Sequence, residues 1–333
     1  MTQEKLPHRK ELCLQSEAGI NYLLCFCCFM NIRDGIYGVA VGDAFGVPFE
    51  FSEAENVQVR ITDSMIGNGT HNQEKGTWSD DTSMTLCLLD SITEEIDYKI
   101  IMESFLQWYK FGKYTANGEC FDIGIGTRRA LQRYMQGISP IKCGSTNVRN
   151  NGNGSLMRCI PIIYYCRNGI RREITHNLSS LTHGNEISLM ACDMYVSFGY
   201  RLLNGMKMDM AYKEAIDETT KYWGKNEVQG IRELVNIFDI EYKDLSGSGY
   251  VITTLQAAIW CLLNTSCYKE CICKCVKIGG DTDTVAAVAG GLAGIVYGKE
   301  NIPKDWMRDL RNKELIENIC DKWEKKFSIK RLQ

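Results

Sequence analysis

Two segments of this chain carry more glycine and alanine than a helix tolerates without compensation. Gly38, Gly42 and Gly46 recur every four residues, so in a helix they form a bare stripe on one face. Residues 285–298 (VAAVAGGLAGIVYG) are similarly rich in small side chains. Each interior glycine costs a helix about 1 kcal/mol relative to alanine, so tight packing must offset the loss. We therefore predict two helices in close helix–helix contact.

Helical periodicity extends through most of the chain. Apolar residues recur at helical spacing from residue 36 to residue 327, as in Leu86, Leu89 and Ile92. The best strand candidate, residues 57–61 (VQVRI), is very short. We find no long linker, repeat or low-complexity tract, and only five prolines. The sequence predicts an all-α, many-helix array in a single domain, with loops at the motifs described below.

Composition excludes several classes of partner. The net charge of −3 gives no electrostatic reason to expect nucleic acid or an anionic membrane. The apolar stretch at residues 22–30 is too short to cross a hydrocarbon core, which requires about 20 helical residues. No small-residue cleavage site follows it, so we interpret it as part of an extension rather than as a signal peptide.

Cysteine is abundant, with sixteen residues. Cys267, Cys271 and Cys275 fall every four residues, on one face of a helix. The spacing C-x3-C-x-C-x-C is not an ordinary zinc-ligand pattern, so a buried stripe of small side chains is favoured over a metal site. So many thiols in a chain with a substantial core favour a reducing compartment, and we expect a cytoplasmic protein.

Three acidic motifs adjoin helices. They are Gly42-Asp43-Ala44-Phe45-Gly46 followed by Glu50, then Gly76-Thr77-Trp78-Ser79-Asp80-Asp81-Thr82, and Gly279-Gly280-Asp281-Thr282-Asp283-Thr284. Ser79 or Asp80 suits a helix N-cap, which by itself requires no chemistry. Residues two apart lie on nearly opposite sides of a helix, so Asp281 and Asp283 converge only if the Gly-Gly turn holds Asp281 in an extended or capping conformation. Such an arrangement suits chelation.

Four carboxylates from the second and third motifs carry four negative charges, which two divalent cations would neutralise. Without cations, crowding would raise several pKa values and cost stability. Neither motif contains histidine or cysteine, and hard oxygen ligands favour Mg²⁺, Mn²⁺ or Ca²⁺ over Zn²⁺. The hydroxyls of Ser79 and Thr284 are further candidate ligands.

In order and spacing, five motifs resemble those of the ADP-ribosylglycohydrolases: Gly42–Gly46 with Glu50, Ser79–Thr82, Gly152–Arg158, His183, and Gly279–Thr284. The resemblance spans about residues 33–300. It implies an all-α orthogonal bundle, in a single domain, with a dinuclear Mg²⁺ centre (Mn²⁺ being the alternative) at the base of a cleft. Residues 1–32 have no counterpart in the pattern and are expected to be an N-terminal extension before a domain at 33–330.

The resemblance also implies roles for individual residues. The metal ligands would be Ser79, Asp80, Asp81, Asp281, Asp283 and Thr284, with Asp283 bridging the two ions. The catalytic carboxyl groups would be those of Glu50, Asp81 and Asp283. The substrate would lie along Gly152, Asn153, Gly154 and Ser155, with His183 near the terminal ribose. Asp122 would have a supporting role. Read from the residues alone, His183 also suits a cap or a buried hydrogen bond, and residues 152–155 suit a loop-to-helix turn capped by Ser155.

The implied activity is Mg²⁺-dependent hydrolysis of the glycosidic bond between ADP-ribose and a protein side chain. An arginine linkage is favoured over serine or other linkages, a small ADP-ribosyl substrate is an alternative, and a monomer is expected. Carboxylates would stabilise oxocarbenium character at the ribose. Two rivals remain: a non-catalytic ADP-ribose-binding protein, and an isoprenoid-synthase-like enzyme. The latter requires Asp-Asp-x-x-Asp, whereas Asp80-Asp81 is followed by Thr82, Ser83 and Met84.

Overall fold

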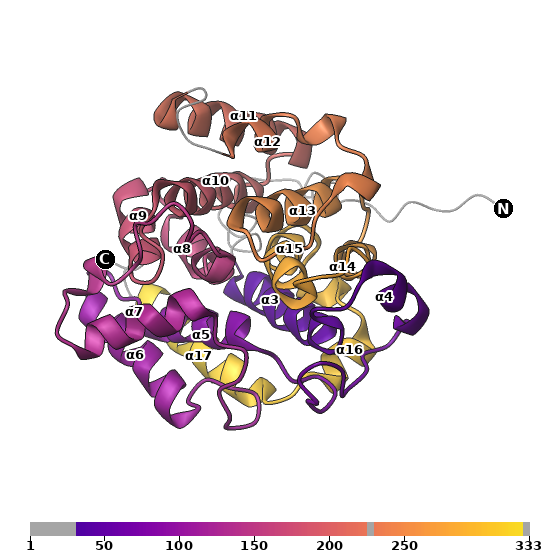
Figure 1. Ribbon diagram of the computed structural model, residues 1–333, viewed down its shortest axis with the longest axis horizontal. Coiled ribbons are helices and arrows are strands. Elements are labelled where there is room, and N and C mark those ends of the chain that lie inside the picture. Colours follow the sequence, from indigo (N-terminus) through magenta and orange to yellow (C-terminus); the bar gives the residue numbers. More distant parts are fainter. Residues whose placement is uncertain (1–30, 225–229, 329–333) are drawn as a thin grey trace, which may run out of the picture. The chain divides into compact units, whose positions relative to one another are not determined.

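The computed structural model describes residues 31–224 and 230–328. Within these ranges no β-strand forms, and isolated bridges pair single residues. The α-helices are α3 (Ile32–Gly46), α4 (Ala54–Arg60), α5 (Asp80–Ser91), α6 (Tyr98–Phe111), α7 (Ile125–Met135), α8 (Ile160–Tyr165), α9 (Arg172–Ser180), α10 (Glu186–Leu203), α11 (Met208–Trp223), α12 (Ile231–Val235), α13 (Val251–Leu263), α14 (Tyr268–Val276), α15 (Thr282–Tyr297), α16 (Lys304–Asp309) and α17 (Lys313–Ser328). The predicted all-α, single-domain fold is confirmed (Figure 1). The extension predicted for residues 1–32 lies almost wholly outside the described residues and stays a prediction.

Helices α3 and α15 lie side by side in the middle of the bundle (Figure 1) and touch backbone to backbone. A Cβ atom built on Gly38 would lie 2.1 Å from the carbonyl oxygen of Gly290, and one built on Gly42 would lie 2.2 Å from that of Ala286. No real side chain fits at such distances. The close helix–helix packing predicted for each small-residue helix is therefore confirmed, and the structure shows that the two helices pack against each other.

The same contact extends to the acidic motifs at the adjoining ends of the two helices. A Cβ atom on Gly46 would lie 2.4 Å from the Cα atom of Asp283. The Thr282 hydroxyl donates a hydrogen bond to the Gly46 carbonyl over 2.9 Å. The backbone that follows α3 is thus fixed directly against the first turn of α15, and this brings the first and third acidic motifs together.

Residues 57–61, the best strand candidate, lie in and after α4, which agrees with the prediction that convincing strands are absent. Glu55 in the first turn and Arg60 in the last suit the dipole of this helix. One local prediction needs correction. Cys267 is exposed, because it precedes α14 and shares no face with it, whereas Cys271 and Cys275 are fully buried as expected. Among the described residues, no cysteine belongs to a group that could hold a metal.

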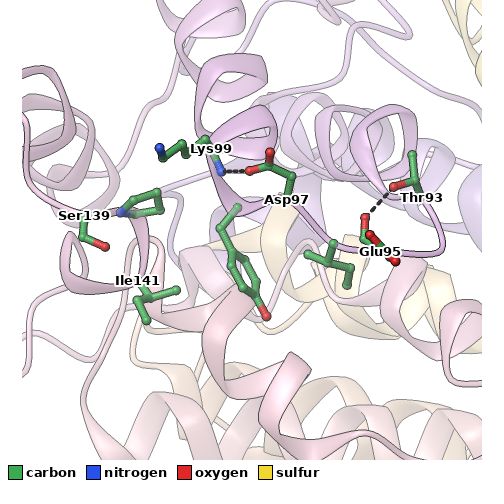
Figure 2. A pocket seen from close by; sticks show the side chains of 9 residues that line it. Thr93, Glu95, Asp97, Lys99, Ser139 and Ile141 are labelled. Carbon is green, nitrogen blue, oxygen red and sulfur yellow. Dashed lines mark hydrogen bonds between the residues drawn. The ribbon is translucent and has the colours of Figure 1, made fainter.

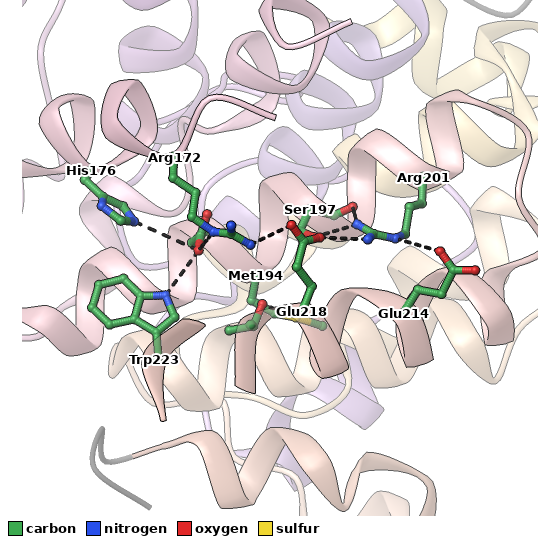
Figure 3. Close-up of polar contacts among 10 residues, drawn as sticks. Arg172, His176, Met194, Ser197, Arg201, Glu214, Glu218 and Trp223 are labelled. Atoms are coloured by element: carbon green, nitrogen blue, oxygen red, sulfur yellow. Dashed lines mark hydrogen bonds and ion pairs between the residues drawn. The ribbon is translucent and has the colours of Figure 1, made fainter. Parts of the chain in front are cut away.

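A buried ionic network joins α9, α10 and α11 (Figure 3). Asp193 on α10 is fully buried, and it accepts hydrogen bonds from Arg172 Nε over 2.8 Å and from the Trp223 indole over 3.1 Å. Arg172 also bonds Glu218 on α11 over 2.7 Å, and Glu218 in turn accepts a hydrogen bond from Arg201. The network therefore ties three helices together around one buried carboxylate.

We expect Gly42→Ala to destabilise the protein by about 2 kcal/mol, because the added methyl must push α15 away, which outweighs the helix preference of alanine. Urea unfolding measures the change. The control is Gly124→Ala, whose methyl meets nothing within 4 Å and costs at most about 1 kcal/mol. Equal losses for the two variants would contradict the packing argument.

Replacing Arg172 by leucine should cost about 2 kcal/mol of unfolding free energy, because the buried Asp193 carboxylate would lose its cation. Lys243→Ala serves as the matched comparison. Its pair with Glu241 is largely exposed, so the loss should stay below about 0.5 kcal/mol. Thermal or urea denaturation gives both values, and a negligible effect of Arg172→Leu would show that the network does not stabilise the fold.

Candidate metal centre and active site

Asp43, on α3, organises the start of α5. Its carboxylate accepts hydrogen bonds from the backbone N–H of Ser79 over 2.9 Å, and from both the N–H and the hydroxyl of Thr82 over 3.0 and 2.6 Å. Ser79 is itself the N-cap of α5, as predicted, and accepts from the N–H of Asp81. Burial raises the pKa of Asp43 to about 6 although these hydrogen bonds oppose the rise. The sequence analysis gave Asp43 no role.

Asp81 follows on α5, where two hydroxyls meet it. Ser79 Oγ and Thr284 Oγ1 donate to Asp81 Oδ2 over 3.0 and 3.2 Å. The predicted metal-ligand hydroxyls therefore lie beside a predicted metal-ligand carboxylate. The other oxygen of Asp81, Oδ1, is buried and has no hydrogen-bond partner, and the same is true of Asp283 Oδ2. Both carboxylate oxygens are buried without a hydrogen-bond partner, and coordination to a divalent cation would satisfy them.

The Gly-Gly turn before α15 sets the position of Asp281. Gly279 and Gly280 have φ values of +78° and +74°, which favour glycine, and Asp281 is the N-cap of α15. Of the two conformations that would let Asp281 converge with Asp283, extended or capping, Asp281 takes the cap position. The turn also fixes the chain after Glu50, because Phe51 N–H donates to the Gly280 carbonyl over 2.7 Å.

The carboxylates converge in two groups. Oxygen atoms of Asp43, Asp81 and Asp283 lie within 4.8 Å of one another, and so do those of Glu50, Asp281 and Asp283. Asp283 belongs to both groups, which is the position that a bridging carboxylate needs. Asp80 is buried nearby but belongs to neither group.

Burial and mutual repulsion dominate the electrostatics of these acids. Burial first, and neighbouring carboxylates second, raise the pKa values of Asp80, Asp81 and Asp283 well above the ordinary range. Burial and the charges of Asp122 and Asp281 raise the pKa of Glu50 to about 10. Divalent cations bound among these acids would neutralise the repulsion and lower these pKa values.

The predicted substrate loop touches the acids directly. Residues Asn153–Ser155 form a 3₁₀ turn after Gly152, and Asn153 Nδ2 donates to Asp281 Oδ2 over 2.8 Å. Ser155 is buried, and its hydroxyl accepts from Cys192 Sγ. The alternative in which Ser155 caps a helix is wrong, because α8 begins only at Ile160.

His183 lies beneath this loop. A Cβ atom on Gly154 would lie 3.0 Å from His183 Cε1, so glycine is needed for the two to approach. His183 Nδ1 is hydrogen-bonded to the Thr182 hydroxyl over 2.8 Å, and burial lowers the pKa of the imidazole to about 3. The ring is therefore neutral, and it satisfies the buried hydrogen bond that the sequence analysis left open.

Two residues near Glu50 complete the site. His71 Nε2 contacts Glu50 Oε2 and lies 3.8 Å from Asp122 Oδ1. Burial raises the pKa of Asp122 to about 7. Sequence reasoning flagged Asp122 but missed His71, because no motif spacing singles out a histidine in the loop before the second motif.

A surface depression of about 590 Å³ lies between residues 93–99 and 139–141 (Figure 2). Its lining includes Asp97, which caps α6 by accepting from the N–H of Lys99 over 2.8 Å. None of the residues that line it belongs to the acid groups. The chemistry of the site therefore rests on the acids rather than on this depression.

A family model described as ADP-ribosylglycohydrolase matches residues 29–332. The chain belongs to the ADP-ribosylglycohydrolase family. This confirms the resemblance, and it confirms at the level of the family that the chain is a hydrolytic enzyme. It also removes the isoprenoid-synthase-like alternative.

Two curated relatives and one solved structure match most of this chain. ADP-ribosylarginine hydrolase Tri1 of Serratia proteamaculans is 33% identical over 299 residues, covering 87% of this chain and 77% of the relative. ADP-ribosyl-[dinitrogen reductase] glycohydrolase of Rhodospirillum rubrum is 30% identical, covering 82% of this chain and 87% of the relative. A solved structure titled ADP-ribosylglycohydrolase-related protein complex superposes with a TM-score of 0.73 at 28% identity, covering 90% and 98% of the two chains.

The family assignment leaves the roles of individual residues as predictions. Among residues 31–224 and 230–328, no helix combines the length and apolar character that crossing a membrane requires. The acid groups supply ligand atoms that could hold metal ions.

Metal and pH should act together on stability. A carboxyl group whose pKa is higher in the folded protein than in the unfolded chain stabilises the fold while protonated, and this stability is lost as pH rises through the folded value. Without metal, the protein should therefore begin to lose stability above about pH 4, the pKa of a carboxyl group in the unfolded chain. The loss should continue as the pH rises through the folded-state pKa values of Asp43, about 6, and Asp122, about 7.

Divalent cations replace these protons, so Mg²⁺ should raise the melting temperature more at about pH 8 than at about pH 5. Differential scanning fluorimetry of protein treated with EDTA and then given defined Mg²⁺ measures the two shifts. Asp283→Asn should abolish the difference. Equal shifts at both pH values in the wild type would contradict a cation site among these acids.

Proposed function

We propose that this chain removes ADP-ribose from arginine side chains of modified proteins by metal-dependent hydrolysis of the glycosidic bond. The observation that carries the proposal is the convergence of two carboxylate groups on Asp283 in a chain of this family. Arginine is favoured over serine because two relatives of at least 30% identity, each matching at least 86% of this chain, are named ADP-ribosylarginine hydrolases.

The proposed ligands for two Mg²⁺ ions, with Mn²⁺ as the alternative, are Ser79, Asp80, Asp81, Asp281, Asp283 and Thr284. Of these, Asp81, Asp281 and Asp283 belong to the two acid groups. The orphaned oxygens of Asp81 and Asp283 support this assignment, and the absence of sulfur or nitrogen donors from the two groups suits a hard cation. When bound, the cations supply positive charge that orients ribose hydroxyls and offsets the buried carboxylates.

The chain's own residues hold the substrate. The glycines of residues 152–154 expose backbone to the diphosphate and ribose, and Asn153 fixes that loop to Asp281. The Nε2 edge of the neutral His183 ring faces this loop, 3.6 Å from the position of a Cβ on Gly152, and can offer a nitrogen to a ribose hydroxyl. The ADP-ribosyl group is thereby held above the acids.

Carboxyl groups then assist bond cleavage. Asp81 and Asp283 stabilise the positive charge that develops at the ribose as the glycosidic bond breaks. Glu50, the carboxyl beside both Asp281 and Asp122, is the proposed proton-transfer group. A protonated carboxylic acid can donate to the leaving nitrogen or oxygen, and the resulting carboxylate can accept a proton from the attacking water.

The proposed setting is the cytoplasm, with an ADP-ribosylated protein as partner and a monomer as the active form. Its support is chemical: the cysteines of the described residues carry free thiols, including Cys267, which is exposed. Exposed thiols persist in a reducing compartment.

ADP-ribose release from arginine-, serine- and other-linked substrates in Mg²⁺ tests the proposal. We expect release from the arginine-linked protein, and losses of at least about 100-fold for Asp81→Asn and Asp283→Asn because outer-sphere groups alone contribute 10- to 100-fold. Asp63→Asn, at an exposed acid paired with Lys269, should retain activity. Binding of ADP-ribose without release from any linkage would favour the non-catalytic reading instead.

A further inference from the structure

The imidazole of His71 contacts the carboxyl group of Glu50, the proposed proton-transfer group. Its Nε2 atom contacts Glu50 Oε2, and one ligand atom from each of His71, Glu50 and Asp122 lies within 4.8 Å of the others. Glu50 is only 3% exposed, so water does not take the place of this contact. The imidazole is therefore placed to fix where the Glu50 carboxyl points on this side, together with the neighbouring Asp122.

The loop that carries His71 is built to hold this position. Asn68, Gly69 and Asn72 all have positive φ values, and Asn68 N–H bonds the Gln73 carbonyl over 2.6 Å. A Cβ on Gly69 would lie 2.0 Å from the carbonyl oxygen of Pro48, so the loop presses on the segment just before Glu50. The loop thus packs directly against the backbone that precedes Glu50.

A second contact from the same loop reaches the Glu50 backbone. The Thr70 hydroxyl donates to the Glu50 carbonyl. Adjacent residues therefore hold the main chain and the side chain of one glutamate, which limits both its rotation and its translation. Such double attachment is expected where a reacting group must be placed to within a fraction of an ångström.

Aromatic rings flank the imidazole. The ring centroid of His71 lies 6.2 Å from that of Phe51 and 5.3 Å from that of Phe121. Phe51 is 67% exposed and has φ of +59°, a costly conformation for a bulky residue that the structure maintains beside Glu50. The rings restrict the plane of the imidazole and so the direction of its Nε2 atom.

We propose that His71 is a positioning residue, which holds the Glu50 carboxyl against the group formed with Asp281 and Asp283 and thereby sets the rate of bond cleavage. The inference rests on the proposed function of this site. One proton between Nε2 and Oε2 suffices for the contact, whichever atom carries it. A displacement of about 1 Å at a reacting group costs about 100-fold in rate, so loss of this contact should lower kcat.

The test compares His71→Leu, His71→Gln and His71→Asn in the full chain with defined Mg²⁺ and an arginine-ADP-ribosylated protein. We expect His71→Leu to lower kcat by about 10- to 100-fold while the Kd of free ADP-ribose changes by less than about 3-fold. Glutamine places an amide nitrogen near the former Nε2 position and should restore most of kcat, whereas the shorter asparagine should not. Lys75→Ala, just after this loop and at a side chain paired with Asp309, should retain activity.

A double-mutant cycle separates positioning from a general structural role. In a Glu50→Ala background, His71→Leu should lower the single-turnover rate by less than about 3-fold, because the contact is already lost. Equal losses in both backgrounds, or no restoration by glutamine, would overturn the proposal.

Nuclear magnetic resonance of ¹⁵N-labelled histidine detects the contact between His71 Nε2 and Glu50 Oε2 independently of enzymatic activity. The Nε2 signal of His71, assigned by its loss in His71→Gln, should shift on Glu50→Gln. An unchanged signal would overturn the positioning role. Failure of the wild type to release ADP-ribose from any linkage, with the signal shifting as expected, would instead reject the proposed function and leave the Glu50–His71 contact established.

Discussion

Backbone contact between α3 and α15 is the constraint on which the site depends. Where Gly38 meets Gly290 and Gly42 meets Ala286, no layer of side chains separates the two helices. Their spacing is therefore set by main-chain atoms, which cannot change rotamer as side chains do. Because the acidic motifs stand at the adjoining ends of these helices, the separation between the first and third motifs is as rigid as the helices themselves.

That rigidity explains how the fold tolerates several buried carboxylates. Acids on flexible segments would turn toward water and reduce their repulsion. Here Asp43 is held by three hydrogen-bond donors from the start of α5, and Asp281 by its place at the helix cap. The remaining desolvation cost is concentrated at one carboxylate oxygen each of Asp81 and Asp283, which accept no hydrogen bond from the protein. The protein thus leaves unsatisfied the atoms that a cation would use.

Sequence reasoning succeeded where local chemistry decides the structure. The four-residue glycine spacing predicts close helix packing, and the Gly279-Gly280 turn allows the extended or capping conformation that Asp281 needs in order to converge with Asp283. It failed where tertiary contacts decide. The four-residue spacing of the cysteines places Cys267 in a buried stripe, yet Cys267 is exposed. No local signal in the sequence shows that His71 reaches Glu50. The loop before the second motif owes its path to Gly69 against Pro48, a contact that periodicity cannot reveal.

The hydrogen bond from Asn153 to Asp281 joins the loop proposed to hold the diphosphate to a carboxylate proposed to hold a cation. Two binding events that share one side-chain contact are not independent. Thermodynamic linkage requires that whatever factor a bound ion applies to nucleotide affinity, the nucleotide applies to ion affinity in return. The Asn153–Asp281 contact would carry such a reciprocal coupling between a bound cation and a bound nucleotide, and the order in which the two bind would leave the final free energy unchanged.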